Sequence, residues 1–212
     1  ELLHGESVAD RLERERFSPT DTARIVSQVA SGLSAAHRAD VVHRDLKPGN
    51  VFLVNMPDGS TFVKLLDFGI SKAESTPRGL TGEFDILGTP EYMPPEQALG
   101  KTALVDHRGD QYSLAVIAFE MLTGQTPFSG NDVMEILRSV IGSNPPKAST
   151  LVSGVPPEVD AVLGRALAKN PSERYADIGE FSTHFARACG HESLSPPGQF
   201  AESARRTGER SL

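Results

Sequence analysis

The sequence is poor in cysteine and in long apolar runs. Cys189 is the single cysteine among 212 residues, so no disulfide can form within the chain. No apolar run reaches the roughly 20 residues that a membrane-spanning helix needs, and the first residues do not resemble a signal peptide. We therefore expect a cytoplasmic, reducing environment for this segment, with any membrane anchor of the full-length protein lying beyond it.

Positive charge is scarce as well. The chain has 21 Lys and Arg residues against 28 Asp and Glu residues, which gives a net charge of −7. Nucleic acids and anionic membrane surfaces bind cationic faces, so the composition argues against either as the main partner. Apolar residues make up 38% and charged residues 23% of the chain, as in a soluble globular protein of one-domain size.

Apolar spacing and capping residues predict a mainly helical chain with one short β-hairpin. Ser18 and Pro19 suit the start of a helix that continues to about Arg38. Two β-prone runs flank Asp58-Gly59, a pair typical of hairpin turns. The runs cover 51–54 and 61–66, and further helices are expected over 110–122, 133–141, 158–169 and 181–188. The segment 191–212 is rich in Ser, Pro, Gly and Arg, which predicts a disordered tail or linker.

Three motifs follow one another between these elements. Residues 43–50 read HRDLKPGN, residues 67–69 read DFG, and residues 88–96 read GTPEYMPPE. Asp and Asn are common in turns, so each motif alone is weak evidence. The ordered set at these spacings resembles the protein-kinase superfamily, and within it the bacterial serine/threonine kinases of eukaryotic type. The resemblance runs from Glu1 to about Ala188.

This resemblance implies a protein kinase-like fold, of which we expect the C-terminal lobe only. Residues 1–190 would form the hinge and that lobe, and 191–212 the tail. A complete kinase also has a Gly-rich loop over the phosphates and a lysine on an N-terminal strand. No Gly-x-Gly-x-x-Gly pattern occurs in the chain, and Glu1 already resembles the hinge. We therefore expect that the N-terminal lobe is missing and that this chain alone has little or no kinase activity.

The resemblance also assigns the reacting groups. Asp45 is in the position of the catalytic base, which orients the substrate hydroxyl and accepts its proton. Lys47 would neutralise charge on the transferred phosphoryl group, and Thr89 would bridge these two residues. Asn50 and Asp67 are hard oxygen ligands suited to Mg²⁺ that bridges the phosphates of ATP. The expected cofactors are therefore ATP and Mg²⁺.

Nucleotide contacts outside the motifs rest on fewer residues. Glu1 and Leu3 resemble the hinge strand, whose backbone pairs with adenine. Ser7 would then fall near the ribose, and Phe52 would form the floor under the base. A plain apolar strand followed by a cap is the alternative interpretation of this first segment.

Other residues of the motifs are expected to be structural supports. By resemblance, Asp110 accepts hydrogen bonds from the backbone of the 43–50 loop, and His43 packs against Phe68. Glu96 would form a buried ion pair with Arg174.

Arg44 has a different role in the family, where it pairs with a phosphate on the activation loop. Thr81 is our first choice of phosphate acceptor. Asp85 is either a permanent anion for Arg44 or an ordinary solvated loop residue.

The leading hypothesis is a serine/threonine protein kinase, a transferase that moves the γ-phosphoryl group of ATP to Ser and Thr hydroxyls of proteins. Protein substrates are the expected partners, together with a kinase homodimer that phosphorylates the activation loop. The alternative function is a non-catalytic, kinase-like binding or scaffold module. The segment Gly88–Tyr92 resembles a peptide-positioning loop, which disfavours a third class, the small-molecule phosphotransferases.

Overall fold

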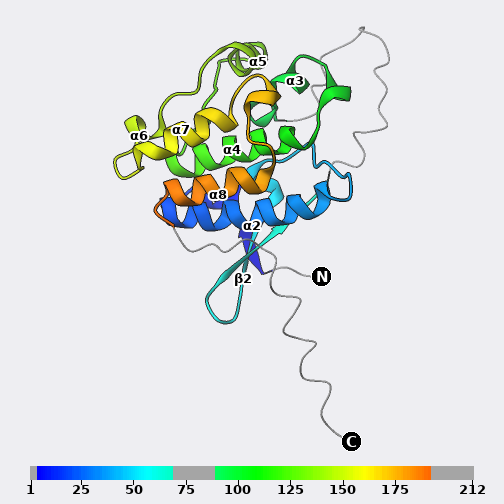
Figure 1. Cartoon of the computed structure of the whole chain (residues 1–212). Coiled ribbons are helices and arrows are strands. Elements are labelled where there is room, and N and C mark those ends of the chain that lie inside the picture. Colours follow the sequence, from blue (N-terminus) through cyan, green and yellow to red (C-terminus); the bar gives the residue numbers. More distant parts are fainter. Residues whose placement is uncertain (1–3, 69–88, 192–212) are drawn as a thin grey trace, which may run out of the picture.

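The computed structural model describes residues 4–68 and 89–191. Several predictions fall outside these ranges and concern Glu1, Leu3, Thr81, Asp85 and the segment 192–212. Figure 1 shows a mainly helical body from which a β-hairpin extends beyond α2. The helices are α1 (Val8–Leu12), α2 (Pro19–His37), α3 (Pro95–Ala98), α4 (His107–Thr123), α5 (Val133–Gly142), α6 (Ala148–Leu151), α7 (Pro157–Ala166) and α8 (Ile178–Ala188).

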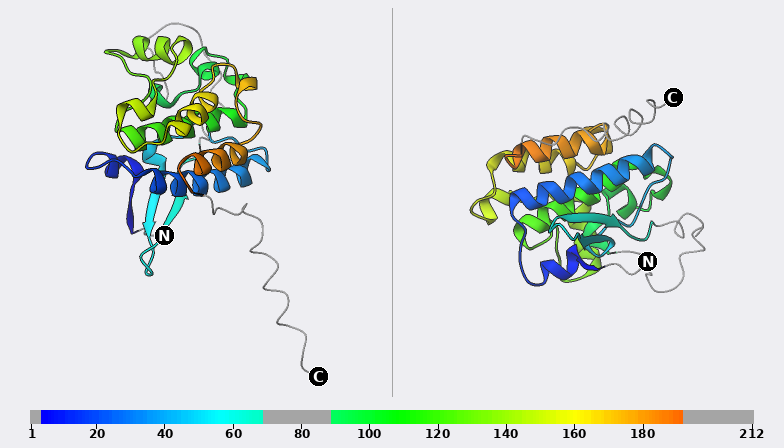
Figure 2. Two further views of the ribbon diagram at one scale, coloured as in Figure 1. Left: turned by 60° about the vertical axis from the view of Figure 1, so that its left-hand side comes forward. Right: turned by 90° about the horizontal axis from the view of Figure 1, so that it is seen from below.

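One helix forms the centre of the body. Helix α4 is buried along nearly its whole length, including its polar residues Asp110 and Gln111. Helices α2, α7 and α8 pack against it, and Figures 1 and 2 show α2 and α8 side by side. Its apolar side chains point in all directions because every face of a central helix meets a neighbour. This confirms the prediction of a buried helix here.

The strands form a small antiparallel sheet in the order β1-β2-β3. They are β1 (Gly5–Ser7), β2 (Val51–Asn55) and β3 (Thr61–Leu65). In the middle of the sheet, Val54 of β2 lies opposite Gly5 on one side and Phe62 on the other. The predicted hairpin is therefore present. The strand β1 that pairs with it begins at Gly5, beyond the hinge strand that we expected at Glu1 and Leu3.

Local capping explains where several helices begin and end. The Ser18 hydroxyl accepts a hydrogen bond from the Asp21 amide, and Pro19 occupies the first turn of α2, as predicted. Gly124 ends α4 with a φ of 78°, a conformation that glycine adopts at little cost. The prediction for 158–169 was too long, because α7 ends at Ala166. Pro171 follows closely, and the residue before a proline disfavours helical geometry.

Candidate active site

Helix α4 supports the loop that carries the 43–50 motif. The Asp110 carboxylate accepts from the His43 amide at 2.8 Å and from the Arg44 amide at 2.9 Å. His37, the last residue of α2, contacts the same carboxylate through Nε2 at 2.7 Å. Asp110 is 1% exposed, so these contacts are shielded from water. The predicted support by Asp110 is confirmed.

The backbone of this loop is under local strain. Arg44 has a φ of 62°, in the left-handed region that a side chain with a Cβ rarely occupies. The two backbone amides that donate hydrogen bonds to Asp110 belong to Arg44 and its neighbour His43. The buried carboxylate therefore compensates for a backbone turn that sets the direction of the next residue, Asp45.

Asp45 and Lys47 lie together at the surface of the loop. Lys47 Nζ is 3.4 Å from Asp45 Oδ2, and the two side chains are 34% and 20% exposed respectively. Asn50 fixes the backbone at this point, because its Nδ2 donates to the Asp45 carbonyl at 2.9 Å. The arrangement presents a carboxylate and an ammonium group side by side, both partly exposed.

The strand β3 brings Asp67 beside this loop. The Leu66 amide donates to the Asn50 carbonyl at 2.9 Å, and His43 Nε2 lies 3.1 Å from the Leu66 carbonyl oxygen. The rings of His43 and Phe68 pack with centroids 4.7 Å apart, as predicted. Asp67 itself is exposed, with a φ of 50°.

Asn50 and Asp67 have the chemistry of a magnesium site. Because the Asn50 amide nitrogen donates to the loop, its oxygen is the group left to coordinate a cation. Mg²⁺ prefers oxygen ligands and commonly takes one or two from the protein, with phosphates and water completing the shell. The described residues contain no cluster of three or more His, Cys, Asp or Glu side chains that could hold a metal.

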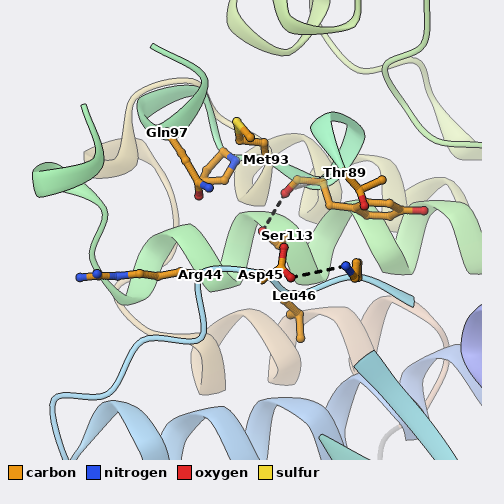
Figure 3. Close-up of a pocket in the computed structure, with 10 residues that line it drawn as sticks. Arg44, Asp45, Leu46, Thr89, Met93, Gln97 and Ser113 are labelled. Atoms are coloured by element: carbon orange, nitrogen blue, oxygen red, sulfur yellow. Dashed lines mark hydrogen bonds and ion pairs between the residues drawn. The ribbon is translucent and has the colours of Figure 1, made fainter. Parts of the chain in front are cut away.

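A small pocket joins this loop to the turn after residue 88. Thr89 lines it together with Asp45 and Lys47, and Figure 3 shows Asp45 and Thr89 among the side chains around the pocket. Arg44 extends in a different direction in the same view. The remaining lining residues are Arg44, Leu46, Tyr92, Met93, Pro94, Gln97 and Ser113.

Helix α4 also fixes the far wall of this pocket. Ser113 Oγ donates to the Tyr92 carbonyl at 2.8 Å, and the Tyr92 hydroxyl donates to Glu120 Oε2 at 2.6 Å. Burial raises the pKa of the Glu120 carboxyl, although the hydrogen bond from Tyr92 opposes this shift. Both the 43–50 loop and the 90–92 turn are therefore positioned by one buried helix.

A comparison of the whole sequence with protein families identifies the family of the chain. A family model described as the protein kinase domain matches residues 1–188. The chain belongs to the protein kinase family.

Similar kinases come from several bacteria. The chain is 45% identical over 157 residues to serine/threonine-protein kinase Pkn1 of Myxococcus xanthus, covering 74% of this chain and 22% of that protein. It is 40% identical over 178 residues to serine/threonine-protein kinase PknL of Mycobacterium tuberculosis, covering 84% of this chain and 43% of that protein. The chain thus spans less than half the length of these two relatives.

A solved kinase structure shares the fold. The crystal structure of the Mycobacterium tuberculosis PknI kinase domain matches with a TM-score of 0.64 and 28% identity. The match covers 89% of this chain and 64% of that one. The protein kinase-like fold that the motifs implied is therefore confirmed for the helical body and its small sheet.

Two residues predicted to contact nucleotide lie in the sheet of this chain. Ser7 is an N-cap residue: its hydroxyl donates to Asp10 Oδ2 at 2.7 Å and accepts from the Asp10 amide at 3.1 Å. It is 8% exposed, so its hydroxyl is committed to starting α1. Phe52 is half-buried on β2, and its ring approaches Gly5 on β1.

Sequence reasoning missed some residues that shape the site. Ser113 and Glu120 lie on the helix that was predicted to be buried, and the hydrogen bonds of Tyr92 join the third motif to them. Polar side chains within an otherwise apolar helix were the available signal, because such groups need partners when buried. Gln28 of α2, whose amide contacts β3, gave no signal at all in the sequence.

Proposed function

We propose that this chain carries the catalytic groups of a serine/threonine protein kinase, which transfers the γ-phosphoryl group of ATP to hydroxyls of protein substrates. The observation that carries the proposal is the partly exposed Asp45 carboxylate 3.4 Å from Lys47 Nζ, on a loop braced by Asp110 and Asn50. Phosphoryl transfer depends mainly on positioning and charge stabilisation. A rigid loop that presents both charges meets this requirement.

Each group has one role in the proposal. Asp45 orients the attacking hydroxyl and accepts its proton, while Lys47 stabilises negative charge on the phosphoryl group in transfer. Thr89 lines the same pocket and is proposed to connect the two through its hydroxyl. Asn50 and Asp67 are proposed as the ligands of Mg²⁺, which when bound bridges the phosphates and neutralises part of their charge.

The remaining parts of the proposal concern the extent of the domain. We take residues 1–190 as the hinge and C-terminal lobe and 191–212 as a linker or tail. Glu1, Leu3 and Phe52 are proposed to contact the adenine. Ser7 remains a candidate for the ribose only if it gives up its capping bonds. The chain has no Gly-x-Gly-x-x-Gly pattern, so transfer is proposed to need a phosphate-covering loop supplied outside these residues.

The partners follow from the same site. Proteins with an accessible Ser or Thr are the proposed substrates, and a second copy of the kinase is one candidate among them. Arg44 is proposed to bind a phosphate on the activation loop. Within the described ranges, no helix is both long and apolar enough to cross a membrane. A cytoplasmic location of this segment is part of the proposal.

The test replaces the proposed base in the full-length protein. Asp45→Asn should lower phosphate transfer from γ-labelled ATP to a protein substrate by at least ~100-fold, because the loss of a general base has an effect of this order. Phosphoamino acid analysis of the wild-type product should give phosphoserine or phosphothreonine. The control Glu158→Gln changes an exposed carboxylate on α7 and should leave the rate unchanged. An Asp45→Asn protein as active as the wild type would refute the proposal.

A further inference from the structure

A side chain of α2 pairs with the open edge of the sheet in the part of the chain that the structure describes. Strand β3 has β2 on one side only, so the backbone groups on its other side need partners from elsewhere. Gln28 of α2 supplies two of them. Its Nε2 donates to the Thr61 carbonyl at 3.1 Å, and its Oε1 accepts from the Val63 amide at 3.0 Å.

The hydrogen-bond pattern of β3 explains why these two groups are available. The Met56 amide donates to Ser60, and the Leu66 amide donates to Asn50. In an antiparallel ladder, alternate residues exchange bonds with the neighbouring strand and those between them face away. Thr61 and Val63 therefore turn a carbonyl and an amide toward α2. A carboxamide can donate to one and accept from the other, as a fourth strand would.

Helix α2 approaches the strand closely at a second point. Gly32 follows Gln28 by one helical turn, so the two residues lie on the same face of α2. A Cβ at Gly32 would lie 3.3 Å from Leu65 Cδ1. The helix therefore contacts β3 near both ends of the strand, and Gln28 makes the hydrogen-bonded contact.

We propose that Gln28 is a positioning residue for the metal and nucleotide site, because it anchors to α2 the strand β3, which leads directly into Asp67. The strand continues from Val63 through Leu66, whose amide meets the Asn50 carbonyl at 2.9 Å. Gln28 thus acts on Asp67 through the strand, without touching the ligand. This inference rests on the proposed function, in which Asn50 and Asp67 are the metal ligands.

The first experiment measures the strand itself. In Gln28→Leu, which keeps the side-chain size and the helix propensity, hydrogen exchange at the Val63 and Leu66 amides should become about tenfold faster, corresponding to the loss of a net hydrogen bond. In Gln28→Glu the carboxylate still accepts from Val63 and cannot donate to Thr61, so the acceleration should be smaller. The control Arg24→Leu changes an exposed residue of α2 paired with Asp21 and should leave both amides unchanged.

The second experiment measures the site without relying on turnover. Binding of Mn²⁺ in the presence of ADP, followed by electron paramagnetic resonance on the full-length protein, should weaken about tenfold in Gln28→Leu, as expected for loss of an outer-shell support. The Mn²⁺ affinity of Gln28→Glu should lie between those of Gln28→Leu and the wild type. The affinity of Arg24→Leu should match that of the wild type. A merely structural role would reduce the folded fraction and leave the metal affinity of the folded protein unchanged.

The outcomes separate the two proposals. If the wild type binds Mn²⁺ and ADP and Gln28→Leu binds them equally well, the positioning role is refuted while the proposed function stands. Unchanged exchange at Val63 in Gln28→Leu would also refute it. If the wild type does not bind Mn²⁺ with ADP, the proposed metal site fails and the positioning role fails with it.

Discussion

Arg174 holds Glu96 inside the protein through two parallel hydrogen bonds. The distances are 2.9 Å from Nη1 to Oε1 and 2.8 Å from Nη2 to Oε2, and the side chains are 0% and 7% exposed. The guanidinium also donates to the Ala168 and Arg108 carbonyls. Every charge in this pair is compensated, as burial requires. The pair joins α3, next to the candidate active site, to the segment that precedes α8.

Removal of either partner should destabilise the fold strongly. Glu96→Ala leaves a buried guanidinium without its counter-ion, and the free energy of unfolding should fall by about 3–5 kcal/mol. Urea titration followed by circular dichroism measures this change. Glu158→Ala, at an exposed position on α7, should change it by less than about 0.5 kcal/mol. A loss below about 1 kcal/mol for Glu96→Ala would contradict the prediction.

Asp110→Asn should loosen the loop that carries Asp45. An amide offers one oxygen where the carboxylate accepts from two backbone amides, and we expect a loss of about 2 kcal/mol or more. Hydrogen exchange at the His43 and Arg44 amides should accelerate. Asp160→Asn is a matched control, because Asp160 accepts two hydrogen bonds from Ser149 far from this loop. The control Asp160→Asn should lower stability without changing hydrogen exchange at the His43 or Arg44 amides. Equal protection of these amides in Asp110→Asn and in the wild type would contradict the prediction.

Two glycine-to-alanine substitutions should change the stability of the fold in opposite directions. Gly124 has a φ of 78°, and an added Cβ would lie 3.2 Å from the Arg16 side chain. Gly124→Ala should therefore cost about 1 kcal/mol or more. Gly164 lies inside α7 with open space around its Cβ position, so Gly164→Ala should stabilise by up to about 1 kcal/mol. Thermal unfolding of both variants tests the pair, and a shift of the same sign in both would contradict it.

Cys189 should make stability sensitive to alkaline pH. Burial raises the pKa of its thiol from 9.0 to about 12. Between these values the unfolded chain loses the thiol proton while the folded chain keeps it, so stability should fall as the pH rises above 9. Urea midpoints at pH 8 and pH 10 should therefore drop further in wild type than in Cys189→Ala. An identical drop in both proteins would show that the thiol does not titrate in this way.

Local signals in the sequence predicted the elements that local chemistry determines. Ser18 and Pro19 gave the start of α2, and the apolar run of α4 gave a buried helix. The resemblance to kinases predicted the buried Glu96–Arg174 pair and the hydrogen bonds that the Asp110 carboxylate accepts from the loop backbone. These contacts were predictable because the family resemblance assigns a role to each of these positions.

Contacts at positions without such a role could not be predicted. Gln28 meets β3 from 33 and 35 residues away, and a glutamine on a helix face is usually a solvated residue. The position of strand β1, a few residues after the expected hinge strand, could not be predicted because β1 is three residues long and pairs with the distant β2. The roles of Asp45, Lys47, Thr89, Asn50 and Asp67 stay predictions, although the fold brings these residues to one region.

The dependence of the 43–50 loop on α4 has a consequence for synthesis of the chain. The loop receives its buried carboxylate from Asp110, which lies 66 and 67 residues further along. A ribosome adds residues one at a time, and contacts between distant residues form late in folding. Asp45 is therefore translated well before its loop can acquire a fixed shape. A nascent chain stalled before residue 110 would carry the whole HRDLKPGN segment and still lack the geometry of the site.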